Sequence, residues 1–268
     1  MGRRYARWSL KLYERYLKEG RGQGEGKDYK PWINIHSFSS RGQVVRDYSY
    51  TVGRVHHLMS KLERNYFVML DWDDSVVDIR EQYPIIEFDK TVAIAKRLGY
   101  KHPMRNKVPI VITSDFCFKK IQEGEAQTVI HTVKPSFDLE DKRVLEKLEI
   151  EKLYYTEKGI EWQVITEKNM NKAEIRNLLW IRPAFFIENV RGYDRIQLNR
   201  FVEELKEYIL TNNLPIRQTT SLFEKNYKTE PGVFMYLFKH LLATKQIRVD
   251  LTKPIDFDAC LNILNVLD

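Results

Sequence analysis

Cysteine is scarce in this chain, since its 268 residues include only Cys117 and Cys260. A disulfide framework needs more cysteines than two, and so does a cysteine zinc site, so both are excluded. Cys117 lies inside an apolar stretch, which is where a cysteine that packs in a core is found. The chemistry of this protein must therefore come from other residue types.

Long apolar runs are also missing. No stretch of about 18 apolar residues occurs, which excludes a membrane-spanning helix. The first eight residues, MGRRYARW, lack the apolar segment of a secretory signal. Because 43% of the residues are hydrophobic, the chain can still build a core, and its length suits one large domain or two ordinary ones. We expect a cytoplasmic protein with no membrane partner.

Two phosphate-binding motifs are absent as well. The glycine-rich stretch at 18–32 is not a P-loop, because Gly26-Lys27 is followed by Asp28 rather than Ser or Thr. We interpret it as a flexible or extended segment. No Ser/His/Asp or Cys/His arrangement stands out. His56 and His57 are adjacent and cannot share one helix face, so we interpret them as structural or DNA-facing.

What the chain does have is an uneven charge. The net charge is +7, and residues 1–60 account for all of it, with 12 Lys/Arg against 5 Asp/Glu. A basic arm suits a polyanionic partner, although an ordinary solvated surface is the simpler alternative. Glycines let a chain approach phosphates closely, so the arm is predicted to contact a nucleic-acid backbone. The residues predicted to do so are Arg21, Lys27, Lys30, Arg54 and His56.

Strands and helices alternate over the first 168 residues, which predicts an α/β domain with a mixed sheet. A helix over 5–19 comes first and ends at Gly20. Strands are expected at 43–52, around 76–82, at 108–118, at 127–134 and at 161–166, with helices at 60–70 and 138–158.

After Asn169 the pattern becomes helical. Helices are expected at about 172–181, 194–211, 216–227 and 231–244, followed by a strand-like alternation of apolar residues at 247–251. Three helices and a β-ribbon predict a winged-helix domain over 169–268, with the boundary at 168–172. The segment 229–242 has apolar residues on too many sides for one small core, which predicts a docking surface.

Two carboxylates and a lysine form the most informative pattern. Asp115 opens one apolar strand and Lys134 ends the next, so they can lie side by side across a sheet. Glu63 lies near the start of the helix over 60–70. Two acids can hold Mg²⁺ for phosphodiester hydrolysis, and a lysine can orient water or neutralise developing charge. Thr132 is expected to share a face with Lys134 and to point towards Asp115.

Each of these residues also has an ordinary interpretation. Ser60 and Glu63 have the spacing of a capping box, in which Glu63 would bond back to the start of the helix. The alternative for Asp115 is a residue that ends a turn, and the alternative for Lys134 is an exposed strand end. The combination of the three residues is more specific than any one of them.

At this point the chain resembles a known family, TnsA, the endonuclease subunit of heteromeric TnsA–TnsB cut-and-paste transposases. The resemblance covers most of residues 15–165 and is weak in the last 100 residues. The stretches that carry it are KEGRGQGEGKDYKPW (18–32), GRVHHLMSKLE (53–63), WDDSVVDIREQYP (72–84), KHP (101–103), TSDF (113–116), VKP (133–135) and LEKLEIE (145–151).

The resemblance implies a restriction-endonuclease-like domain over 1–168 that uses Mg²⁺, with Mn²⁺ as a substitute, followed by the winged-helix domain. It implies cleavage of the 5′ strands of double-stranded DNA at transposon ends in a prokaryotic cytoplasm. The partners implied are a TnsB-like transposase and a TnsC-like AAA+ ATPase. The catalytic roles fall on Glu63, Asp115 and Lys134.

One position departs from the pattern of such nucleases. The residue two before the lysine usually carries Glu, Asp or Gln, and here it is Thr132. The expected ligand set is therefore Glu63, Asp115, Thr132 and the Val133 carbonyl, with Asp73 and Glu149 as candidate compensating acids. Two other functions stay open: an adapter that recruits the transposase and the AAA+ regulator with weak or no cleavage, and a stand-alone restriction or repair nuclease.

Overall fold

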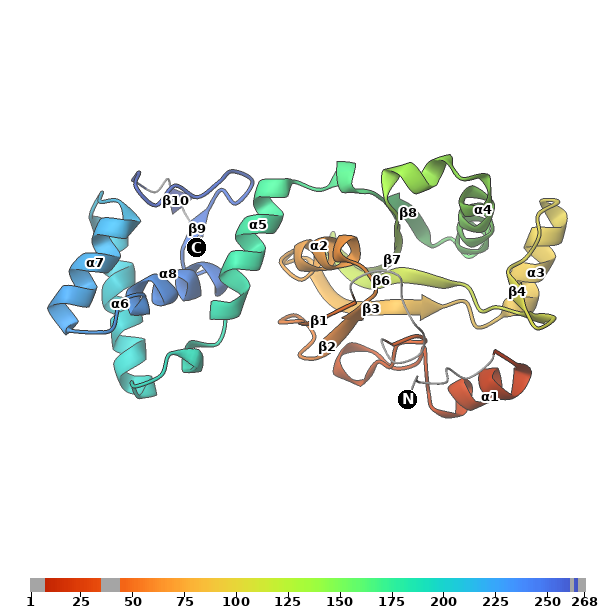
Figure 1. Cartoon of the computed structure of the whole chain (residues 1–268), viewed down its shortest axis with the longest axis horizontal. Helices are drawn as coiled ribbons and strands as arrows, with labels where there is room; N and C mark the ends of the chain where they lie inside the picture. The colour runs from red at the N-terminus through yellow and green to blue at the C-terminus, as the bar shows by residue number, and fades with distance from the viewer. Residues whose placement is uncertain (1–7, 35–43, 261–262, 265–268) are drawn as a thin grey trace, which may run out of the picture. The chain divides into compact units, whose positions relative to one another are not determined.

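The computed structural model describes residues 8–34, 44–260 and 263–264 (Figure 1). The chain divides into two compact units, Met1–Met170 and Asn171–Asp268. The sequence-based boundary was 168–172. Within the described residues, no helix combines the length and the apolar character needed to cross a bilayer.

A four-stranded sheet forms the centre of the first unit. Its strands lie in the order β3 (Val76–Pro84), β6 (Thr113–Gln122), β7 (Glu125–Val133) and β8 (Glu161–Ile165) (Figure 1). The first three strands are antiparallel, and β8 runs parallel to β7. The predicted mixed α/β sheet is confirmed.

Helices cover both faces of this sheet. Because side chains alternate along a strand, Cys117 and Phe116 point to opposite faces. Cys117 packs in one apolar cluster with Ile150 of α4 (Lys142–Thr156) and Ile94 of α3 (Phe88–Arg97). Phe116, on the other face, packs edge-on against Tyr66 of α2 (Lys61–Leu70). The predicted core role of Cys117 is confirmed.

Smaller elements complete the first unit. They are α1 (Leu10–Lys18), the hairpin of β1 (Val45–Tyr48) and β2 (Val55–Leu58), the hairpin of β4 (Met104–Arg105) and β5 (Val108–Pro109), and the 3-10 turns Gly26–Asp28, Ser136–Glu140 and Glu167–Asn169. The sequence did not predict β2, α3 or β4. The strand expected over 108–118 is two strands, because β5 pairs with β4 and only β6 joins the main sheet.

The glycine-rich segment is folded onto β3, so the expectation of a flexible segment there was wrong. The Gly26 amide donates to Asp78 (2.9 Å), and the Tyr29 hydroxyl donates to the Glu81 carbonyl (3.1 Å). A Cβ on Gly22 would lie 2.2 Å from Pro84, and its φ is +74°. Glycine is therefore needed here for close packing and a left-handed backbone.

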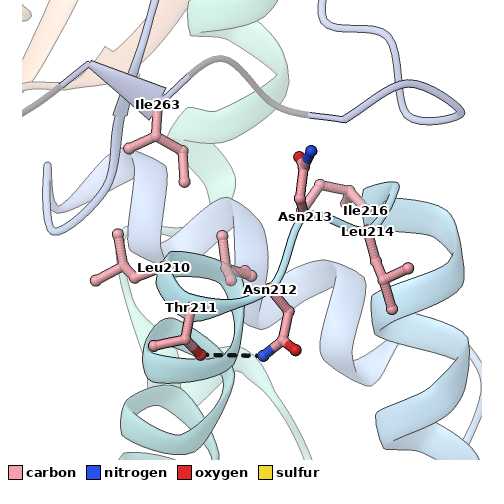
Figure 2. Close-up of a pocket in the computed structure, with 8 residues that line it drawn as sticks. Leu210, Thr211, Asn212, Asn213, Leu214, Ile216 and Ile263 are labelled. Atoms are coloured by element: carbon pink, nitrogen blue, oxygen red, sulfur yellow. Dashed lines mark hydrogen bonds between the residues drawn. The ribbon is translucent and has the colours of Figure 1, made fainter.

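The second unit is mainly helical (Figure 1). It contains α5 (Lys172–Ile181), α6 (Arg195–Thr211), α7 (Ile216–Tyr227), α8 (Val233–Ala243), the 3-10 turns Arg182–Ala184 and Ile187–Asn189, and an antiparallel ribbon of β9 (Arg248–Val249) with β10 (Ile263–Leu264). A small pocket between the end of α6, the start of α7 and β10 is lined by Leu210, Leu214 and Ile263, with the amides of Asn212 and Asn213 (Figure 2).

Helix α8 lies at the centre of this unit. It packs against α5, α6 and α7, and seven of its eleven residues are buried, among them Phe234, Leu237 and Phe238. Its many apolar sides are therefore covered by neighbouring helices. The prediction of a docking surface on this helix was wrong, because α5, α6 and α7 all pack against it and cover its apolar residues.

Candidate active site

The first turn of α2 positions Glu63. Ser60 caps the helix by accepting the Glu63 amide (3.1 Å), and its hydroxyl donates to Glu63 Oε1 (2.9 Å). The Met59 amide donates to Oε2 (2.9 Å). The Ser60 half of the predicted capping box is thus present, while the Glu63 carboxylate accepts from the Met59 amide and the Ser60 hydroxyl rather than from the Ser60 amide, and these bonds hold it in a fixed direction. The two interpretations of Glu63 are compatible, because the cap aims the side chain at the site.

Asp115 lies near the start of β6, beside the end of β7. Its Oδ2 accepts the Val133 amide (2.7 Å) and the Lys134 ammonium (2.9 Å). Lys134 Nζ also donates to the Val133 carbonyl (3.0 Å). The side chain of Asp115 is 10% exposed and that of Lys134 is 31% exposed. The structure thus brings Asp115 and Lys134 together.

Gln82 joins the two acids, and sequence reasoning missed it. Its Nε2 donates to Glu63 Oε2 (3.3 Å) and to Asp115 Oδ1 (3.4 Å), and the residue is 4% exposed. Its φ is +49°, which is uncommon for a residue other than glycine. With this backbone conformation near the end of β3, the Gln82 side-chain amide lies between the two carboxylates. The alternation of residues along a strand gave no signal for the position of Gln82.

The charges of the site act on one another. Burial, and then the negative charge of Asp115, raise the pKa of Glu63 to about 7. Burial alone would lower the pKa of Lys134, but the Asp115 carboxylate raises it above its ordinary value. At neutral pH the ammonium therefore stays charged, while the Glu63 carboxyl is easily protonated.

The structure corrects the placement of Thr132. Its hydroxyl donates to Glu151 Oε1 on α4 (2.5 Å), not towards Asp115. The reason is that β7 ends at Val133, so Lys134 lies past the strand and need not share the face of Thr132. With its hydroxyl held by Glu151, Thr132 leaves the set of expected metal ligands.

Glu151 is a third buried acid beside Glu63 and Asp115, and the sequence did not single it out. Ser114 (2.6 Å) and the Trp162 indole (3.0 Å) donate to the same Oε1 as Thr132. Burial raises its pKa, and these hydrogen bonds oppose the rise. Glu151 thus ties together the residues that precede Asp115 and Val133. The compensating acids proposed from sequence were wrong, because Glu149 and Asp73 are exposed, whereas the acids of the site are buried, and Asp73 bonds to Ser75 instead.

Two of the five residues predicted to contact DNA are internal instead. His56 is fully buried beside Phe67, and Arg54 donates to both carboxylate oxygens of the buried Glu81 (3.0 and 2.5 Å). This corrects the DNA-facing roles of Arg54 and His56.

The basic side chains of the glycine-rich segment are only partly available. Arg21 lies 3.6 Å over the Tyr16 ring and donates to Glu19. Lys30 donates to the Glu19 carbonyl (3.2 Å). Lys27 is exposed, and its contact with DNA stays a prediction.

The donors of the site fit a divalent cation. The carboxylates of Glu63 and Asp115 and the Val133 carbonyl supply the oxygen ligands that Mg²⁺ prefers, whereas Gln82 turns its Nε2 towards the two acids and its oxygen towards the Thr113 hydroxyl. Two buried carboxylates whose charges oppose each other would gain from a cation between them. Only two acids are involved, since within the described residues no three His, Cys, Asp or Glu side chains are grouped to hold a metal.

Two family profiles match most of the chain. The family profile described as "TnsA-like endonuclease N terminal" matches residues 73–167, and the profile "TnsA endonuclease C terminal" matches residues 169–251. The chain belongs to the TnsA family of endonucleases. The N-terminal match contains Gln82, Asp115, Lys134 and Glu151, while Glu63 precedes it.

One curated relative is the Transposon Tn7 transposition protein TnsA of Escherichia coli. It is 44% identical over 167 residues, which are 62% of this chain and 60% of that protein. The alignment thus spans three fifths of the relative's length. This chain and its relative are both members of the TnsA family.

Proposed function

We propose that this protein is a Mg²⁺-dependent DNA endonuclease that cuts the 5′ strands at transposon ends, together with a TnsB-like transposase. The observation that carries the proposal is the set of contacts around Asp115. One carboxylate oxygen is bonded to Lys134, and the other is linked through Gln82 to Glu63. The TnsA-family match and the similarity to a Tn7 transposition protein support a role in transposition.

The chain's own residues have separable roles. Glu63, Asp115 and the Val133 carbonyl would hold Mg²⁺, which when bound stabilises charge on the scissile phosphate and lowers the pKa of water. An ammonium has three N–H donors, and Lys134 gives one to Asp115 and one to Val133. The third is available for a phosphate oxygen or the attacking water. Gln82 keeps the two carboxylates at a fixed separation.

The test is strand-resolved nicking. A duplex that carries a transposon end is labelled separately on each strand and incubated with the protein in Mg²⁺, in Mn²⁺ or in EDTA, with and without the TnsB-like transposase. The proposal expects cleavage of the 5′ strand only, in either metal and not in EDTA. Equal cleavage of both strands by this protein alone would instead indicate a stand-alone nuclease.

The adapter function has one observation in its favour. Two acids rather than three converge on the candidate metal site of the described residues, which suits weak metal binding. An adapter would assemble with the transposase and a TnsC-like AAA+ ATPase on transposon-end DNA without nicking it in either metal. Nicking in the assay above decides for the endonuclease.

A further inference from the structure

We propose that residues 101–109, which are the β4–β5 hairpin and the three residues before it, form a basic finger that grips the DNA backbone beside the active site. It rests on the proposed function, because it takes DNA to be the substrate. The residues that carry it are Lys101, Arg105 and Lys107, which are all exposed. None of them belongs to the N-terminal arm that the sequence analysis singled out.

The charge of this region is one-sided. Between Asp89 and Asp115 the chain has six Lys or Arg residues and no Asp or Glu. Two of the six are neutralised on α3, where Lys90 pairs with Glu87 and Arg97 pairs with Glu157. Within the described residues the other four, Lys96, Lys101, Arg105 and Lys107, form no ion pair. Uncompensated exposed cations of this kind suit a polyanion.

The tip of the hairpin holds a lysine where glycine is favoured. Asn106 and Lys107 have φ of +52° and +60°, and Arg105 pairs with Val108. Two positive φ values in a two-residue loop are those of a type I′ turn, whose second position favours glycine. A lysine there adds backbone strain, and strain retained at an exposed tip points to a role for the side chain.

The finger is braced against the rest of the first unit. The Trp8 indole donates to the Pro109 carbonyl (2.9 Å), and the Asn106 amide donates to the Trp8 carbonyl (3.1 Å). On the other side His102 Nε2 lies 2.8 Å from the Thr91 hydroxyl of α3. These contacts hold the hairpin backbone that carries the cations in place before DNA binds, so little backbone-ordering entropy opposes binding.

The finger is also close in sequence to the active site. Eight residue steps separate Lys107 from Asp115, which is at most about 29 Å of extended chain. One turn of B-DNA spans about 34 Å. The phosphates that the finger reaches therefore lie within about one turn of the cleaved phosphate.

The test compares two triple variants of the full chain that lose the same number of charges. The finger variant is Lys101→Gln, Arg105→Gln and Lys107→Gly, in which glycine keeps the turn. The control is Lys142→Gln, Lys147→Gln and Lys152→Gln on α4, where the lysines are also exposed. Binding of a random-sequence duplex is measured by fluorescence anisotropy in EDTA between 50 and 200 mM NaCl.

We expect the finger variant to bind more weakly at low salt. The slope of its log affinity against log salt should be smaller in magnitude than the wild-type slope by about 2 to 3. The control should keep most of the wild-type slope. Equal curves for wild type and finger variant, or equal losses in both variants, would overturn the proposal. The single variant Lys107→Gly, which relieves strain and so should fold at least as well, must also weaken binding.

A measurement on the wild type does not depend on variants. Acylation of Lys101 and Lys107 by an amine-reactive reagent should be suppressed by the duplex, while that of Lys142 and Lys147 should not. Unprotected finger lysines contradict the proposal. All of these readouts are made in EDTA and do not depend on cleavage. A protein that binds DNA through the finger but never nicks it would therefore contradict the proposed function and leave the finger proposal intact.

Discussion

At the scale of single residues, Glu63 links stability to pH. Its pKa is raised in the folded protein to about 7, from an ordinary value of 4.5. The folded state therefore holds the proton more tightly than the unfolded state. The resulting stability is fully present below pH 4.5 and is lost as the pH rises through 7, with a magnitude of up to about 3 kcal/mol.

Glu63→Gln should remove this dependence while keeping the cap, because glutamine is also accepted at that position of a capping box. Urea unfolding in EDTA at pH 5 and pH 8 measures it. We expect a smaller difference between the two pH values in the variant than in the wild type. Glu149→Gln, at an exposed acid of α4, should leave the wild-type difference unchanged, and an unchanged difference in Glu63→Gln would contradict the account.

Gln82 gives a second prediction at this scale. Gln82→Leu removes the donor between two buried carboxylates, and buried acceptors without donors cost about 1 to 3 kcal/mol. We expect lower stability in EDTA and weaker Mn²⁺ binding by calorimetry. The matched change Gln127→Leu, at an exposed position of β7, should do neither. If both variants behave alike, Gln82 does not organise the site.

At the scale of elements, Glu151 fastens α4 to the strand ends that carry the site. Glu151→Leu leaves the hydroxyls of Ser114 and Thr132 and the Trp162 indole without their shared acceptor. We expect a loss of several kcal/mol, since each unmet buried group costs about 1 to 3 kcal/mol. Chemical denaturation should show this loss for Glu151→Leu and almost none for the exposed Glu149→Leu. Similar losses in the two would contradict the role of Glu151.

Several helices and strands could be predicted from the spacing of apolar residues in the sequence. Apolar patterns correctly predicted α2, α4, β3 and β7 and the first half of β6, and with them the meeting of Asp115 and Lys134. They did not predict Gln82, because its direction depends on a positive φ that leaves no mark in the pattern. They also misplaced Thr132, because the end of a strand cannot be read from alternation. Glycines that serve close packing, such as Gly22, look in sequence like a flexible segment.

At the scale of the whole molecule, the first unit has its own core. The apolar cluster around Cys117 and Ile150 and the one around Trp32 both lie within residues 1–170. A fragment of residues 1–170 should therefore fold cooperatively and show the same rise in melting temperature with Mn²⁺ as the full chain. A fragment that aggregates or melts without a transition would show that the first unit depends on residues 171–268.

The central claim is that Glu63, Asp115 and Lys134 form a site for metal-dependent cleavage, and Asp115 is the residue that contacts the rest of it. The most direct test is cleavage of labelled transposon-end DNA in Mg²⁺, with the TnsB-like transposase, by wild type, Asp115→Asn and the control Asp89→Asn on α3. We predict that Asp115→Asn is folded and binds DNA but leaves the 5′ strand intact, while Asp89→Asn cuts as the wild type does. Wild-type cleavage by folded Asp115→Asn protein would contradict the account.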